Sequence, residues 1–227
     1  DASGIHLGVL PIGTGCDFVK AAAITKNTAQ TLYLIKTGLA RPVDVGRLVF
    51  MDHTGAKRDS YFINVTSFGL GGEVIRRVNR MPPAIGPFIS FLWAALASIV
   101  MFGNKTLRLK SDSGFDRELD VLNVAIANGQ YHGGGMWIAP HASLYDGLFH
   151  VTIVGGLSLF EVIKNLPNLY NGNIYRVRKV ISFTGKKIEA DSSQPILLDV
   201  DGEQMGTLPV TVEILPGALS MIIGETR

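Results

Sequence analysis

Three short segments carry residue types that could do chemistry. The first is a glycine turn, Gly13-Thr14-Gly15, which follows an apolar run and precedes a helix pattern starting at Asp17. Glycines let backbone N–H groups approach a phosphate closely, and a helix that begins just after them adds unsatisfied donors and a partial positive charge. The segment therefore allows a phosphate-binding turn, although this spacing is more often plain strand-to-helix punctuation.

The second segment gathers acids near a strand end, at Asp199, Asp201 and Glu203. Strand alternation would place Asp199 and Asp201 on the same face, and a turn at Gly202 could bring Glu203 toward a pocket. Crowded carboxylates raise one another's pKa and could serve as a general base or hold a metal. A solvated acidic turn explains the pattern equally well.

The third segment, Ser143 to Leu148, contains the dipeptide Asp146-Gly147. A carboxylate beside a glycine turn can combine with neighbouring carbonyl oxygens to bind Mg²⁺ or Ca²⁺. One carboxylate makes a weak site, and an ordinary Asp-Gly hairpin turn is the more frequent explanation.

Three consecutive glycines, Gly133 to Gly135, follow a strand pattern. Such a run costs chain entropy and suits a loop that lines a site, or a wide turn between two strands. His132 and His141 flank the loop, but no acidic pattern accompanies them in the sequence. Neither histidine is assigned a role from the sequence.

The elements that must position these residues change character along the chain. An apolar run at 5–12 predicts a buried strand, and 17–24 and 28–38 predict helices, the second ended by glycine. Short apolar and period-2 runs then predict a β-sandwich. These strands are expected at 43–50, 61–65, 107–109, 119–127, 149–154, 179–183, 196–200, 210–215 and 219–223, with a polar turn at 52–59.

Two helices interrupt the strands. Residues 87–102 place large apolar side chains on one helical face, which predicts a helix in the core or facing lipid. The stretch is too short and too rich in serine to favour a membrane span. Residues 158–170 predict a second helix, interrupted at Pro167.

Composition narrows the function class. The 227 residues are 47% hydrophobic and 18% charged, with a net charge of +2 spread along the chain. This argues against nucleic-acid binding and allows transient contact with a membrane surface. The single Cys16 rules out an internal disulfide, and with no signal peptide the compartment is expected to be cytoplasmic. The absence of an initiator methionine suggests a fragment.

Taken in order, the motifs resemble the diacylglycerol kinase catalytic family in its bacterial lipid-kinase branch, which is also similar to sphingosine kinases. Nearly the whole chain takes part in the resemblance. The matching segments are Leu7 to Phe18, Arg41-Pro-Val-Asp-Val-Gly46, Phe62-Ile-Asn-Val65, Gly133-Gly-Gly-Met136, Ile138-Ala-Pro140, Asp146-Gly147 and Asp201-Gly-Glu203.

The resemblance implies a mainly β chain, with 1–40 as the remnant of an α/β nucleotide-binding domain and 41–227 as a β-sandwich lipid-substrate domain with one apolar helix. It implies ATP and Mg²⁺ as cofactors and phosphorylation of the hydroxyl of diacylglycerol or a related lipid. The implied roles are nucleotide binding by Gly13, Thr14, Gly15 and Asp17, metal binding by Ser143, Asp146 and Leu148, and catalysis by Glu203 with Asp201.

The chain also departs from the family pattern. The upstream Gly-Gly-Asp-Gly-Thr segment is not present in this sequence, so the fragment alone is expected to be inactive. Cys16 stands in place of the usual asparagine, and His150 where an acidic residue is common. An enzyme similar to NAD kinases, or an inactive lipid-binding or regulatory protein, stays open as an alternative. The sequence names neither the lipid nor the oligomeric state, and a peripheral membrane location and a homodimer both stay open.

Overall fold

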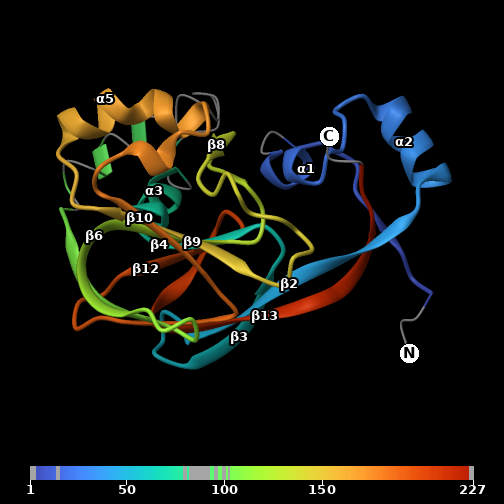
Figure 1. Cartoon of the computed structure of the whole chain (residues 1–227). Coiled ribbons are helices and arrows are strands. Elements are labelled where there is room, and N and C mark those ends of the chain that lie inside the picture. Colours follow the sequence, from blue (N-terminus) through green and yellow to red (C-terminus); the bar gives the residue numbers. More distant parts are fainter. Residues whose placement is uncertain are drawn as a thin grey trace.

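The computed structural model describes residues 4–13, 16–78, 81, 93–94, 97–98, 101 and 103–224 (Figure 1). The helical elements are α1 (Asp17–Ala21), α2 (Thr28–Thr37), α3 (Leu70–Val78), α5 (Leu159–Tyr170) and the 3₁₀ turn η2 (Ile174–Arg176). The strands are β1 (Leu7–Gly8), β2 (Ala40–Met51), β3 (Lys57–Phe62), β4 (Val65–Gly69), β5 (Lys105–Ser111), β6 (Asp116–Ala127), β7 (Tyr131–His132), β8 (Met136–Trp137), β9 (Phe149–Gly155), β10 (Val180–Gly185), β11 (Lys187–Asp191), β12 (Leu197–Val200) and β13 (Glu203–Ile222). The prediction of a mainly β chain is confirmed.

The central sheet closes on itself. Strands β6, β4, β12, β13, β11 and β5 form a circuit of antiparallel pairs that returns to β6. The two long strands make closure possible, because β6 pairs first with β5 and then with β4, and β13 pairs first with β12 and then with β11. Each changes partner at a register shift, near Val121 and near Thr207. Such irregularities bend a strand, so β6 and β13 each pass from one layer of the predicted sandwich to the other. The two layers are therefore joined into a six-stranded barrel.

Alternating apolar residues of these strands fill the barrel. Phe68 of β4 and Leu107 and Leu109 of β5 are fully buried there. The same cluster includes Phe62 of β3 and Phe149 of β9, which stack with ring centroids 5.6 Å apart. Strands β9 and β10 extend the sheet beyond β6, and β2 and β3 extend it beyond β13. The core is therefore enclosed by one continuous sheet.

The predicted strand at 61–65 is interrupted in the structure. Phe62 ends β3 and Val65 begins β4, with a bend at Ile63 and Asn64 between them. The backbone N–H groups of this bend donate to the Asp201 carboxylate. An apolar sequence run cannot reveal such a partner, which explains why the interruption was not predicted.

The N-terminal segment packs against the far end of β13 (Figure 1). The two predicted helices are present as α1 and α2, and Asn27 caps α2 by accepting the Gln30 N–H at 3.1 Å. The predicted buried strand at 5–12 is wrong in extent and burial. Only Leu7–Gly8 pair, in parallel with β13, and Ile5 and Ile12 are exposed because the described residues provide no second layer over them.

Helix α5 begins where the sequence indicates. Ser158 and Glu161 form a capping box in which each side chain bonds the other residue's backbone N–H. The predicted interruption at Pro167 is wrong, because the helix continues to Tyr170 and the Asn171 N–H bonds the Pro167 carbonyl. The predicted helix at 87–102 lies mostly outside the described residues. Within the described parts of the chain, no helix is both long and apolar enough to cross a membrane.

Gly46 provides a test of the packing between β2 and β3. It lies opposite Phe62, and a Cβ at this position would overlap the Phe62 ring. We expect Gly46→Ala to lower the free energy of unfolding by about 1–3 kcal/mol, because the buried ring has to move. Urea unfolding would measure the change. Gly4→Ala is the matched control, since nothing lies within 4 Å of a Cβ there; equal stability of the two variants would contradict the packing argument.

Candidate functional site

Asp201 and Gly202 form the tight turn that joins β12 to β13. Both residues have positive φ, 49° and 92°, and Val200 pairs with Glu203 across the turn. This is the pattern of a two-residue type I′ hairpin, for which Asp-Gly is a preferred sequence. The turn makes Glu203 the first residue of β13, where it is exposed.

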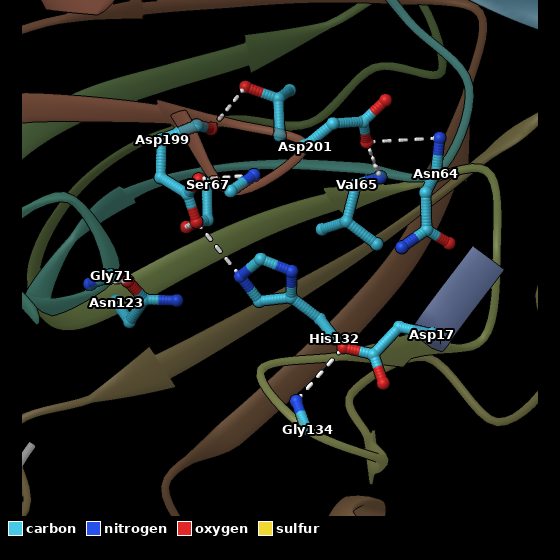
Figure 2. Close-up of polar contacts among 12 residues, drawn as sticks. Asp17, Asn64, Val65, Ser67, Gly71, Asn123, His132, Gly134, Asp199 and Asp201 are labelled. Atoms are coloured by element: carbon cyan, nitrogen blue, oxygen red, sulfur yellow. Dashed lines mark hydrogen bonds and ion pairs between the residues drawn. The ribbon is translucent and has the colours of Figure 1, made fainter. Parts of the chain in front are cut away.

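The Asp201 carboxylate accepts three backbone N–H groups from the bend between β3 and β4 and from the first residue of β4, and Figure 2 shows the bonds from Asn64 and Val65. The donors are Ile63 at 2.8 Å, Asn64 at 3.1 Å and Val65 at 2.9 Å. Burial of the carboxyl group raises the pKa of Asp201 by more than these three bonds lower it, so the net shift is upward. The bonds fix the β12–β13 turn to a segment far away in sequence. In the structure Asp201 therefore positions the turn that carries Glu203.

Asp199 is fully buried and pairs with His132 (Figure 2). Its Oδ2 lies 2.9 Å from His132 Nε2 and accepts the Ser67 hydroxyl at 3.3 Å, and its Oδ1 accepts the Gly202 N–H at 2.9 Å. Burial lowers the pKa of His132. The charge and hydrogen bond of Asp199, together with the charges of Asp17 and Asp201, raise the pKa by more than burial lowers it, so the net shift is upward. The pair is a buried polar centre outside the barrel core.

The prediction that Asp199 and Asp201 share a face is wrong. Strand β12 ends at Val200, and the positive φ of Asp201 breaks the alternation on which that prediction depended. One carboxylate is directed at His132 and the other at the β3–β4 bend (Figure 2). The two acids therefore have separate partners.

The triple-glycine loop connects β7 to β8, and Asp17 holds it. Gly133, Gly134 and Gly135 all have positive φ, which explains the need for glycine. Asp17, at the start of α1, accepts the Gly134 N–H at 2.9 Å (Figure 2) and the Gly135 N–H at 2.7 Å. The loop thus joins the N-terminal segment to the strand that carries His132.

The predicted nucleotide turn is only partly described. Gly13 is exposed in a bend, and the Cys16 thiol donates to its carbonyl oxygen at 3.3 Å. Thr14 and Gly15 lie outside the described residues. Nucleotide binding by this turn and by Asp17 stays a prediction.

An apolar cavity of about 180 Å³ lies beside the His132–Asp199 pair. Helix α3 contributes one side of it; its Gly71 N–H bonds Asn123 Oδ1 at 2.9 Å, and both residues line the cavity. Helix α5 contributes another side. The cavity is larger than the cavity of about 150 Å³ that accommodates a benzene ring in a protein interior. Its apolar lining includes Leu70, Val74, Ile75, Leu122, Ile138, Val154, Val162, Leu166, Leu169 and Ile174.

The loop that contains Asp146 has hydrogen-bond partners different from those of the Asp199–Asp201 region. The Asp146 carboxylate accepts the Leu148 N–H at 3.0 Å and lies 3.2 Å from His150 Nε2. Gly147 in the same loop donates its N–H at 2.7 Å to the buried Asp44, which also accepts the Gly217 N–H at 2.7 Å. No hydrogen bond found among the described residues joins this loop to Glu203. In the part of the chain that the structure covers, no three His, Cys, Asp or Glu residues gather as a metal site.

Two important side chains were missed from the sequence. His132 received no role because its partner Asp199 is distant along the chain, and the neighbouring glycines were its only local signal. Asp44 was seen only as part of a motif, although an acid between Val43 and Val45 in a strand pattern points to a buried carboxylate with structural partners.

Comparison with known proteins gives consistent matches. The family model of the YegS C-terminal NAD kinase beta sandwich-like domain matches residues 64–223. A "Probable lipid kinase YegS-like" protein of Pseudomonas putida is 28% identical over 220 residues, covering 97% of this chain and 69% of that protein. The Klebsiella pneumoniae protein of the same description is 27% identical over 225 residues, covering 96% and 69%.

The fold is also similar to solved structures. The crystal structure of a diacylglycerol kinase from Bacillus anthracis str. Sterne aligns with a TM-score of 0.65 at 18% identity, covering 96% of this chain and 67% of that one. At this identity the match supports the fold alone.

The His132–Asp199 pair predicts a pH-dependent stability. The pKa of His132 is raised in the folded state, so protonated His132 stabilises the fold. This contribution to the free energy of unfolding is fully present at pH values below the ordinary histidine pKa, and it is lost as the pH rises through the folded-state pKa. We expect His132→Gln to lower the free energy of unfolding by about 2 kcal/mol near pH 6. The difference should shrink as the pH rises from the ordinary histidine pKa through the raised pKa of the folded state.

Urea unfolding of both proteins over this pH range would measure the effect. His53→Gln, at an exposed histidine in the β2–β3 turn, is the control. A difference for His132→Gln that stays constant with pH would show that its ionisation does not contribute.

Proposed function

Because the chain belongs to the YegS-like lipid kinase and diacylglycerol kinase family, as its C-terminal β-sandwich domain, we propose that it forms the lipid-binding part of an ATP- and Mg²⁺-dependent kinase. The reaction transfers the γ-phosphoryl group of ATP to the hydroxyl of diacylglycerol or a related lipid. The observation that carries the proposal is the apolar cavity beside the buried His132–Asp199 pair.

The cavity suits an acyl chain. Each methylene group moved from water into an apolar site contributes about 0.8 kcal/mol, so a short length of chain supplies useful affinity. His132 and Asp199 are the charged residues of the lining, which gives the cavity one polar side toward which a lipid's oxygen atoms would be directed. A soluble dinucleotide, the substrate of the NAD kinase alternative, would leave its charged groups against apolar side chains.

Glu203 is the general base in this proposal. A lipid hydroxyl attacks phosphorus efficiently only if a positioned group accepts its proton. Glu203 is exposed at the start of β13, and Asp201 holds the preceding turn through its three backbone hydrogen bonds. Asp201 is therefore a positioning residue, and Glu203 takes the proton.

The Asp146 loop would hold Mg²⁺ through the Asp146 carboxylate and the backbone oxygens of Ser143 and Leu148. Mg²⁺ prefers oxygen ligands and commonly retains several waters, so a single carboxylate fits it. The ion supplies charge neutralisation for phosphate oxygens. His150 lies against the same carboxylate, and a protonated His150 would compete with the metal.

The glycine turn Gly13-Thr14-Gly15 would contact ATP through its backbone. The Asp17 carboxylate already accepts two N–H groups of the triple-glycine loop. We therefore assign Asp17 the role of fixing the turn beside that loop, since a carboxylate would repel a phosphate.

A transfer assay tests the base. We expect Glu203→Gln in the full-length protein to lower kcat for lipid phosphorylation roughly 100- to 10,000-fold, because the amide cannot accept the proton. Radiolabelled ATP and lipid extraction would measure the product. Glu189→Gln, on an exposed part of β11, is the control and should keep full activity. Equal rates for all three proteins would remove Glu203 from the mechanism, and a wild-type protein inactive on every lipid would favour the inactive lipid-binding alternative.

A cavity-filling variant tests the lipid site. We expect Leu166→Trp to raise KM for a long-chain lipid about tenfold, because the larger side chain displaces roughly two methylene groups of the substrate. The KM for ATP should not change. Leu32→Trp, on the exposed face of α2, is the control. An unchanged lipid KM in Leu166→Trp would show that the acyl chain binds elsewhere.

A further inference from the structure

Helix α5 exposes large apolar side chains. None of its residues is buried, and Phe160 and Ile163 are 76% and 53% exposed. The helix lies on the outside of the sheet, across the α3 side of the barrel (Figure 1). A helix of a soluble domain normally turns such residues inward, so this face is suited to an apolar partner.

The same region is strongly basic. Residues 156–180 contain four basic side chains and one acid, Glu161, which gives a net charge of +3. Glu161 forms an ion pair with Lys179, so the excess positive charge resides on exposed Lys164, Arg176 and Arg178. Exposed apolar residues combined with basic residues match an anionic lipid surface, where the apolar side chains enter the headgroup region and the cations meet lipid phosphates.

The apolar cavity opens on this side. Ile163 and Tyr170 both line the cavity, and both are exposed, Tyr170 by 46%. A second, more polar depression adjoins it and is lined by Arg178, Lys179 and Glu161. The headgroup of a lipid could therefore lie beside these cations while its acyl chain enters the adjoining cavity. The acyl chain would not be exposed to solvent on the way.

We propose that the outer face of α5, with Lys164, Arg176 and Arg178, docks on an anionic bilayer and admits the acyl chain at Ile163 and Tyr170. This inference rests on the proposed lipid-kinase function, because it specifies how that function's substrate arrives. The charge of the region selects an anionic membrane over a second copy of the chain, since two copies of the same basic face would repel each other.

Vesicle binding by the full-length protein tests the surface. The probes are vesicles of phosphatidylcholine alone and of phosphatidylcholine mixed with phosphatidylglycerol. We expect binding to the mixed vesicles that weakens at high salt, because exposed charges are screened. Phe160→Glu and the double variant Lys164→Glu/Arg178→Glu should each reduce this binding about tenfold or more.

Tyr33→Glu, on the exposed face of α2, is the matched control and should bind as the wild type. Equal binding of all variants to both vesicle types would overturn the proposal. A dimer that Phe160→Glu converts to a monomer while vesicle binding persists would assign the face to self-association instead.

Phosphorylation of a water-soluble short-chain lipid separates the two proposals. We expect Phe160→Glu to retain this activity while losing activity on lipid in vesicles. Loss of both activities with vesicle binding intact would overturn the docking role. A wild-type protein without activity on any lipid would refute the kinase proposal, and vesicle binding would still decide whether α5 docks.

Discussion

Backbone N–H groups at turns must find acceptors, and in this protein aspartate side chains supply them. Most of these N–H groups are partly buried, so water cannot fully replace the carboxylates that accept them, and the turns outside the ladders are stabilised by these side chains. Asp201 serves the bend after β3, Asp17 serves the triple-glycine loop, and Asp44 serves Gly147 and Gly217. Each bond connects segments far apart in the sequence, so the acids that shape the candidate site also hold the fold.

This arrangement changes how the acidic residues are interpreted. A carboxylate that already accepts two or three N–H groups is suited to holding a segment in place, and its charge is stabilised by those donors. Glu203, at the start of β13, differs because its carboxylate forms no hydrogen bond or ion pair with the residues that the structure describes. Hydrogen bonds therefore separate the acids that hold turns in place from Glu203, the acid proposed as the base.

The closed barrel and the apolar cavity are separate parts of the molecule. The barrel interior is filled by apolar side chains such as Phe68, Leu107 and Leu109, so no ligand can enter it without unfolding the core. The cavity instead lies outside the barrel, where α3 and α5 cover the sheet. His132 and Asp199 join the two parts, since Asp199 belongs to a barrel strand and also lines the cavity.

The sequence by itself determined the local structure and the family. Helix caps, Asp-Gly turns and apolar periodicity involve residues within a few positions of one another, so the mainly β character and the starts of α1, α2 and α5 could be predicted. The order of the motifs was sufficient to indicate the lipid-kinase family, which the match over residues 64–223 supports.

Only the tertiary structure decided which polar residues meet. Asp201 and Asn64 are 137 positions apart, and their contact depends on the register of β4 against β12 and β6. The same holds for His132 and Asp199, for closure of the barrel at two register shifts, and for the cavity between helices that are distant in sequence. Local propensity cannot encode these features, because each arises from packing between segments whose separation along the chain carries no information about their distance in space.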